Sequence, residues 1–80
     1  MYSVYILQST KDTRFYTGTT ENLNARLIEH NSGRVASTRL RAPLELRWHC
    51  IFRNKYKALE FEKYLKSGSG HAFVHKHLLP

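Results

Sequence analysis

Hydrophobic residues near the start of the chain follow the two-residue period of β-strands. Residues 2–8 are apolar on both alternating sets, which predicts a strand in the middle of a sheet with both faces covered. A polar turn over residues 9–13 separates this strand from a second, short strand over residues 15–17, which ends at Gly18. The two strands are close enough in sequence to pair as an antiparallel hairpin.

A third strand is predicted over residues 44–53, where apolar and polar side chains alternate. The apolar face carries Leu44, Leu46, Trp48, Cys50 and Phe52. The polar face carries Glu45, Arg47, His49 and Arg53, with Ile51 as the exception. This regular alternation predicts one buried face along the whole strand. On that face Cys50 is expected to be a small buried hydrophobe rather than a nucleophile.

The first helix is predicted between the second and third strands. Thr20 as a cap and Glu21 in the first turn indicate where it begins. It runs to about residue 31, with Gly33 as its stop. Its core-facing stripe comprises Leu23, Leu27 and, less directly, Ile28. Residues 32–43 then form a basic loop.

Two further helices are predicted after the third strand. One covers residues 56–67 and stops at Gly68, and Ser69 can cap a last short helix that runs to residue 79. The order is strand, strand, helix, strand, helix, helix. It predicts an α+β domain in which helices cover one or both faces of a three-stranded sheet.

The length of 80 residues is that of one domain, expected to span residues 1–80. The longest apolar run covers residues 4–7, far short of the ~20 residues that a membrane span needs. No signal peptide is predicted, because the first residues lack a basic segment followed by a long apolar one. The single cysteine excludes an internal disulfide and a cysteine-rich zinc site, and we expect a cytoplasmic protein.

Positive charge is the first indication of function. Thirteen Lys and Arg against six Asp and Glu give a net charge of +7, which is typical of proteins that meet a nucleic acid or an anionic membrane surface. We favour a nucleic acid over the alternative that the charge serves only solubility. The planar guanidinium of arginine suits phosphate oxygens. The arginines expected to bind nucleic acid are Arg34, Arg39, Arg41 and Arg47. The histidines without zinc spacing, expected at the surface or on phosphates, are His49, His71, His75 and His77.

Polar side chains near Gly18 are candidates for chemistry. Tyr5 and Tyr16 lie on the hairpin strands and meet beside Gly18 if both project from one face; the alternative is ordinary core packing. One stripe of the first helix carries Asn22, Arg26 and His30. An Arg and a His on this stripe would engage a phosphate, unless the stripe is only a solvated face.

Glu62 is the most informative residue of the second predicted helix. The core-facing positions of this helix are Ala58, Phe61, Glu62 and Leu65. A carboxylate in such a position is costly unless it is paired, hydrogen-bonded or bound to a cation. Three alternatives follow for Glu62: a metal ligand, half of an ion pair with an Arg or Lys from the sheet, or a position at the edge of the stripe.

Together these residues form an ordered set of motifs. The set comprises Ser3-Val4-Tyr5, then Tyr16-Thr17-Gly18, Arg26, His30-Asn31-Ser32-Gly33, and Glu62 with Lys63. This set resembles the GIY-YIG nuclease superfamily over nearly the whole chain, and its small stand-alone members most. Ser3 and Thr17 stand where the two motifs have Gly and Ile. In the second motif, Gly18 would let the backbone approach the nucleic acid closely.

The resemblance implies a central three-stranded antiparallel sheet flanked by helices, and metal-dependent cleavage of phosphodiester bonds. It implies that Tyr5 or Tyr16 positions or deprotonates the attacking water, and that Arg26 holds the scissile phosphate. His30 would orient a tyrosine or take part in proton transfer. Glu62 would be the single protein ligand of one Mg²⁺ or Mn²⁺, an ion that commonly uses one or two carboxylates.

Three functions are therefore in competition. The leading hypothesis is an endonuclease acting on DNA, and the same features would also accept RNA. The runner-up is a nucleic-acid-binding module with the same fold that does not cut. The third is a nuclease subunit that is active only with a protein partner supplying target specificity. Glu62 separates the first two, because a carboxylate that faces a polyanion repels phosphate unless it holds a cation.

Overall fold

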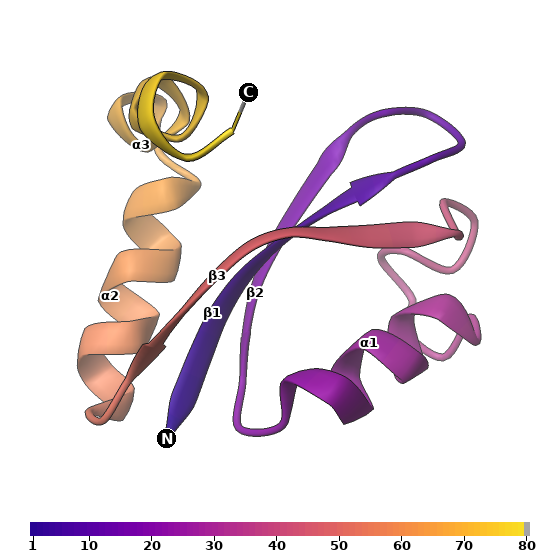
Figure 1. The fold of residues 1–80 in the computed structure, drawn as a ribbon, viewed down its shortest axis with the longest axis horizontal. Helices are drawn as coiled ribbons and strands as arrows, with labels where there is room; N and C mark the ends of the chain where they lie inside the picture. Colours follow the sequence, from indigo (N-terminus) through magenta and orange to yellow (C-terminus); the bar gives the residue numbers. More distant parts are fainter. Residues whose placement is uncertain (80) are drawn as a thin grey trace.

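A three-stranded antiparallel sheet lies between helices in the computed structural model, which describes residues 1–79 (Figure 1). The strands are β1 (Tyr2–Ser9), β2 (Phe15–Thr20) and β3 (Leu44–Phe52), in the spatial order β2-β1-β3. The helices are α1 (Leu23–Asn31), α2 (Lys55–Leu65) and α3 (Gly68–Phe73), and α3 continues into a π-helical turn, η1 (Val74–Leu78). The predicted fold class and element order are confirmed. Every helix within residues 1–79 is too short or too polar to cross a lipid bilayer.

The central strand β1 has an apolar cluster on each of its faces. Its residues 4–7 are at most 1% exposed, as expected for a strand covered on both sides. The cluster toward α2 comprises Val4, Ile6, Ala58, Leu65, Val74 and Leu79. The cluster toward α1 comprises Tyr5, Leu7 and Leu44, with Tyr16, Leu23 and Leu27 packed against it. The sheet therefore separates two thin cores, one under each helical layer (Figure 1).

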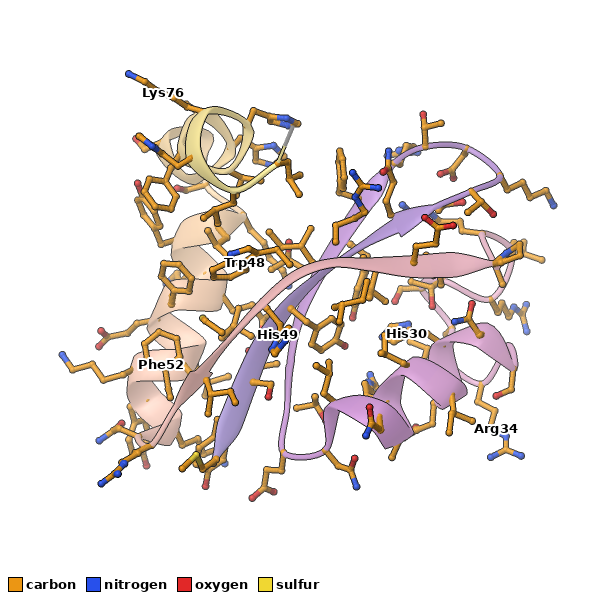
Figure 2. All side chains as sticks on the ribbon, viewed as in Figure 1. His30, Arg34, Trp48, His49, Phe52 and Lys76 are labelled. Atoms are coloured by element: carbon orange, nitrogen blue, oxygen red, sulfur yellow. The ribbon has the colours of Figure 1, made fainter. Side chains whose placement is uncertain are left out.

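The regular alternation predicted along β3 is wrong at Arg47. Ile6 of β1 pairs with Trp48, and the following residue of β1 pairs with Leu46. Arg47 is therefore an extra residue on β3, and this β-bulge exchanges the two faces of the strand. Leu44, before the bulge, packs in the cluster toward α1. The residues after the bulge that pack toward α2 are Trp48, Cys50 and Phe52 (Figure 2).

The first helix begins later than the sequence predicts. Its cap is Asn22, whose side-chain oxygen accepts from the backbone N–H of Ala25 at 3.1 Å. The Thr20 hydroxyl instead accepts from the backbone N–H of Asn22, so Thr20 shapes the turn before the helix. Asn22 is the cap because its side-chain oxygen reaches the backbone N–H three residues later, as in a standard N-cap. Ile28, predicted at the margin of the apolar stripe, is 66% exposed.

The C-terminal helices also begin and end at other residues than predicted. Helix α2 ends at Leu65. The hydroxyl of Ser67 accepts from the backbone N–H of Gly70 at 3.1 Å, which makes Ser67 the cap of α3. The predicted cap, Ser69, therefore lies inside α3. The short connection brings α3 onto the same side of the sheet as α2 (Figure 1).

Gly18 is an interior residue of β2 and does not end it. It is buried and pairs with Tyr5 of β1. A Cβ at this position would lie 2.5 Å from the Tyr5 hydroxyl oxygen, 2.7 Å from Tyr5 Cζ and 3.2 Å from Tyr16 Cε1. The close approach that the structure places at Gly18 is therefore that of the Tyr5 ring, and the glycine itself is buried.

We expect the substitution Gly18→Ala to destabilise the fold by about 1–3 kcal/mol, because the new methyl group overlaps the buried Tyr5 ring. The matched control is Gly68→Ala, where no atom lies within 4 Å of the added Cβ. This control should be neutral or stabilising by up to about 1 kcal/mol. Urea unfolding of both variants measures the difference. Equal stabilities of the two variants would contradict the packing role of Gly18.

Candidate functional site

Tyr5 and Tyr16 come together beside Gly18 on the face of the sheet that α1 covers. The hairpin register pairs Leu7 with Tyr16, which places Tyr16 on the same face as Tyr5. The two ring centroids are 6.4 Å apart. The ring of His30 lies against both, with centroids 5.8 Å from Tyr5 and 4.9 Å from Tyr16. The three aromatic side chains therefore form one cluster.

His30 is fully buried at the end of α1, between the helix and the sheet (Figure 2). Its Nε2 is hydrogen-bonded to the Tyr5 hydroxyl at 2.9 Å, and its Nδ1 to the Thr38 hydroxyl at 2.7 Å. The solvated-face alternative is therefore wrong for His30. It is also wrong to group Asn22 with it, because Asn22 caps the helix. Burial, and next the charge of Arg26, lower the pKa of His30 below its ordinary value of 6.5.

Arg26 lies one helical turn before His30 and close to the Tyr5 hydroxyl. Its side chain is 33% exposed and donates to Glu29 at 3.2 Å. Burial raises the pKa of Tyr5 above its ordinary value of 10.0, and the neighbouring Arg26 guanidinium opposes this rise. A half-exposed cation beside a buried phenol is a place where an anion from solution can bind.

Glu62 lies on the other side of the sheet, on α2, and its side chain is 20% exposed. One carboxylate oxygen accepts from the Thr19 hydroxyl at 2.5 Å, and the other from the Lys66 ammonium group at 2.6 Å. Glu62 is therefore at the edge of the apolar stripe and is paired. Its cationic partner, Lys66, is the C-cap residue of the same helix, whereas the sequence suggested an Arg or Lys of the sheet.

The two sides meet at the edge strand β2. Thr19, which binds Glu62, directly follows Gly18, which lies under Tyr5. The charge of Glu62 is near enough to contribute to the raised pKa of Tyr5. A hollow of about 250 Å³ opens beside Glu62, with Tyr2 in its wall. The carboxylate and the tyrosine cluster therefore approach the same strand from opposite faces of the sheet.

A divalent cation fits Glu62 on the chemistry of the groups present. Residues 1–79 contain no group of three or more His, Cys, Asp or Glu side chains arranged to hold a metal ion. Mg²⁺, however, commonly takes one or two carboxylates and completes its shell with water and phosphate oxygens. The Lys66 side chain is 52% exposed and can leave the carboxylate without losing buried contacts. Glu62 with substrate oxygens is thus a suitable donor set.

The arginines of the basic loop and of β3 differ in their availability. Arg34 points away from the body of the protein (Figure 2), and Arg39 is also exposed. Arg47 is exposed at the bulge of β3. Arg41 is held inside the fold, because it donates to the Asp12 carboxylate at 3.1 Å. Its charge is therefore the least free of the four to meet a phosphate.

Three residues of this arrangement were missed by the sequence analysis: Thr19, Thr38 and Lys66. The four-residue spacing from Glu62 was an available signal for Lys66. Thr19 is one of several threonines beside Gly18, and Thr38 lies in an irregular loop. No pattern singles either of them out, because their contacts join segments far apart in the sequence.

The family model that matches the chain is described as the GIY-YIG catalytic domain, and it covers residues 1–73. The chain therefore belongs to the GIY-YIG family, as the motifs predicted. The residues of the family motifs come together in this fold. Both tyrosines, Arg26 and Glu62 lie near Gly18 of the edge strand β2. The matched model describes the catalytic domain of a family of nucleases.

Within this family the chain is similar to UPF0213 proteins. It is 33% identical to one from Vibrio campbellii over 66 residues, which cover 81% of this chain and 62% of that protein. It is 45% identical to one from Clostridium perfringens over 67 residues, 82% of this chain and 71% of that protein. The solution NMR structure of a UPF0213 protein from Bacillus halodurans matches with a TM-score of 0.60 and 33% identity, over 100% of this chain and 89% of that one.

Stability should fall as the pH drops below 6.5, because His30 gains a proton more easily in the unfolded chain than in the folded one. The unfolded state then binds more protons, so acid favours unfolding, by at most about 1.4 kcal/mol for each pH unit. Urea unfolding at about pH 7.5 and about pH 5.5 measures this loss. The loss should shrink in His30→Asn and persist in a control, His71→Asn, whose histidine is exposed. The same pH dependence in all three proteins would contradict the assignment.

Proposed function

We propose that this protein is a divalent-metal-dependent endonuclease that hydrolyses phosphodiester bonds in DNA. The observation that carries the proposal is the buried Tyr5–His30 pair beside the half-exposed Arg26, with Glu62 reaching the same strand edge from α2. Phosphodiester hydrolysis needs a deprotonated water, donors for the charge that develops on phosphate, and help for the leaving oxygen. These residues can supply all three.

Tyr5 is better suited than Tyr16 to accept the proton of the attacking water. Its hydroxyl is hydrogen-bonded to His30, and the neighbouring Arg26 charge opposes the rise in the Tyr5 pKa that burial causes. Arg26 donates to the non-bridging oxygens of the scissile phosphate, where negative charge grows in the transition state. Tyr16 packs against His30 and keeps the cluster in place. The net positive charge holds the sugar–phosphate backbone without regard to sequence.

Glu62 would hold one Mg²⁺ or Mn²⁺ through a single carboxylate. Such an ion would supply positive charge at the phosphate. Thr19 orients the carboxylate through its hydroxyl, and Lys66 balances the charge until the substrate arrives. The carboxylate is then neutralised in either state, which removes the repulsion that a bare acid would exert on DNA.

The decisive test is plasmid nicking with Mg²⁺ or Mn²⁺ by the protein and by Glu62→Gln. Cleavage should be lost in the variant, because a neutral amide is a much poorer ligand for a hard cation. DNA affinity in metal-free buffer should stay the same or rise. The free energy of unfolding should change by less than about 1 kcal/mol, because the partner cation is exposed. Glu60→Gln, an exposed acid on the same helix, is the matched control and should cut normally.

A destabilised Glu62→Gln protein whose metal response is unchanged would overturn the metal-ligand role. If neither the wild-type protein nor the control cuts any plasmid while both bind DNA, the non-catalytic binding module replaces the nuclease as the conclusion.

Salt dependence tests which arginines meet the DNA. Arg34→Ala and Arg39→Ala should each reduce the slope of log affinity against log salt by about one, because each removes a free phosphate contact. Arg41→Ala should leave the slope nearly unchanged and cost about 0.2–1 kcal/mol of stability, because Arg41 is paired with Asp12. Fluorescence anisotropy with a DNA duplex over a salt series gives the slopes. A larger effect of Arg41 than of Arg34 would refute this division.

A further inference from the structure

Three buried side chains form a hydrogen-bonded chain from the basic loop to the tyrosine cluster. They are Thr38 of the loop, His30 of α1 and Tyr5 of β1, and each is at most 1% exposed. Thr38 Oγ1 lies 2.7 Å from His30 Nδ1, and Tyr5 Oη lies 2.9 Å from His30 Nε2. Thr38 has no place in the mechanism above, although it is as deeply buried as the histidine it contacts.

The protons along this chain allow two directions. In one, the Tyr5 hydroxyl donates to Nε2 and Nδ1–H donates to the Thr38 oxygen, so the hydroxyl proton of Thr38 has no acceptor within the chain. In the other, the Thr38 hydroxyl donates to Nδ1 and Nε2–H donates to the Tyr5 oxygen, so the phenolic proton of Tyr5 has no acceptor within the chain. A neutral imidazole has one donor and one acceptor nitrogen, so the two ends cannot both be donors to it.

The two ends differ in what surrounds the remaining proton. Among residues 1–79, the only group hydrogen-bonded to the Thr38 hydroxyl is His30 Nδ1. A buried hydroxyl that keeps its proton without an acceptor is disfavoured. At the other end, the Tyr5 hydroxyl lies beside Arg26, which is partly open to solvent and suited to an anion. The excess proton is therefore better placed on Tyr5, from which it can also be lost.

We propose that Thr38 is a positioning residue whose hydroxyl donates a hydrogen bond to His30 Nδ1. This bond keeps the imidazole neutral, with its proton on Nε2. His30 is then a hydrogen-bond donor to the oxygen of Tyr5. The consequence for cleavage depends on the function proposed above, whereas the position of the imidazole proton does not. Tyr5 then releases its phenolic proton to bulk water. The resulting phenolate, with its single negative charge, takes the proton of the attacking water.

Loss of that proton satisfies the whole chain. The phenolate oxygen accepts from Nε2–H, and Nδ1 accepts from Thr38, so no donor lacks an acceptor. The Thr38–His30 hydrogen bond also joins the basic loop to the site. Within the loop, the backbone N–H of Arg41 donates to the Thr38 carbonyl at 2.9 Å. The segment that carries the exposed arginines thus also carries the hydroxyl that sets the imidazole.

Other titratable groups face Tyr5, and they stay the same when Thr38 is changed. Arg26 of α1 favours the phenolate, and Tyr16 of β2 and Glu62 of α2 oppose it. Glu29 of α1 acts on His30, and His49 is the register partner of Tyr5 on β3. A change seen on substituting Thr38 alone is therefore due to the hydrogen bond that Thr38 makes.

The first experiment is long-range ¹H–¹⁵N NMR of the histidine rings in the protein alone, at about pH 7.5, where histidine is ordinarily neutral. The expected result is a neutral His30 with its proton on Nε2. A proton on Nδ1, or a charged ring, overturns the proposal. Because no DNA or metal is present, this outcome is independent of whether the protein cuts.

The second experiment compares Thr38→Val, Thr38→Ser and a control, Ser37→Ala, an exposed neighbour in the same loop. Thr38→Val should remove the preference for Nε2–H and raise the pKa of Tyr5 by about one pH unit, measured on ¹³C-labelled tyrosine. Below that pKa the cleavage rate should fall roughly tenfold, with the pH profile displaced to higher pH. Thr38→Ser should restore both, and Ser37→Ala should change neither.

An unchanged Tyr5 pKa in a folded Thr38→Val protein overturns the proposal. If Thr38→Val does not fold, the wild-type tautomer and a wild-type-like Thr38→Ser decide the matter. A protein with the expected tautomer and pKa values but no nuclease activity in any form would refute the proposed function and leave the role of Thr38 in place.

Discussion

The hydroxyl of Tyr5 is the group on which the rest of the site depends, because a polar atom inside an apolar core must be hydrogen-bonded. Leaving such a hydroxyl without a partner costs about 1–3 kcal/mol, a large share of the stability of so small a domain. His30 provides the partner and must itself be buried, which requires a second partner for its other nitrogen. Thr38 meets that requirement and fixes the loop against α1. One buried phenol thus determines contacts in three separate segments.

The same ring explains why the neighbouring strand contains a glycine. Tyr5 lies across Gly18, and any side chain there would occupy the space of the phenol. The edge strand can then pass close to the site, and Thr19 on its other face receives Glu62. A three-stranded sheet has only one central strand, so groups on its two faces can meet only around an edge. The short strand β2 supplies this edge, and for this reason a domain of this size can combine a phenol, a guanidinium and a carboxylate.

The charges of the protein fall into a structural and an available set. Arg26 with Glu29, Arg41 with Asp12 and Lys66 with Glu62 are paired within the fold, whereas Arg34, Arg39 and Arg47 are exposed. Composition counts all of them equally, but a paired cation must first break its pair to bind phosphate. The paired cations differ in how far solvent reaches them: the Arg41 side chain is 20% exposed and the Lys66 side chain is 52% exposed. Lys66 is therefore the less tightly held of these two cations.

The sequence by itself determined the elements, their order, the central place of β1 and the residues of both motifs. Apolar periodicity reports burial directly, and the motif residues are recognisable by type and spacing. It did not reveal the bulge at Arg47. Apolar residues continue to alternate with polar ones along β3, although the apolar residues before and after the bulge face opposite sides of the sheet. It also left His30 open to a solvated face and Glu62 open among three roles. Tertiary structure decided that His30 is buried and that Glu62 is paired, because the partners Thr38 and Thr19 lie 8 and 43 residues away in sequence and leave no local signal.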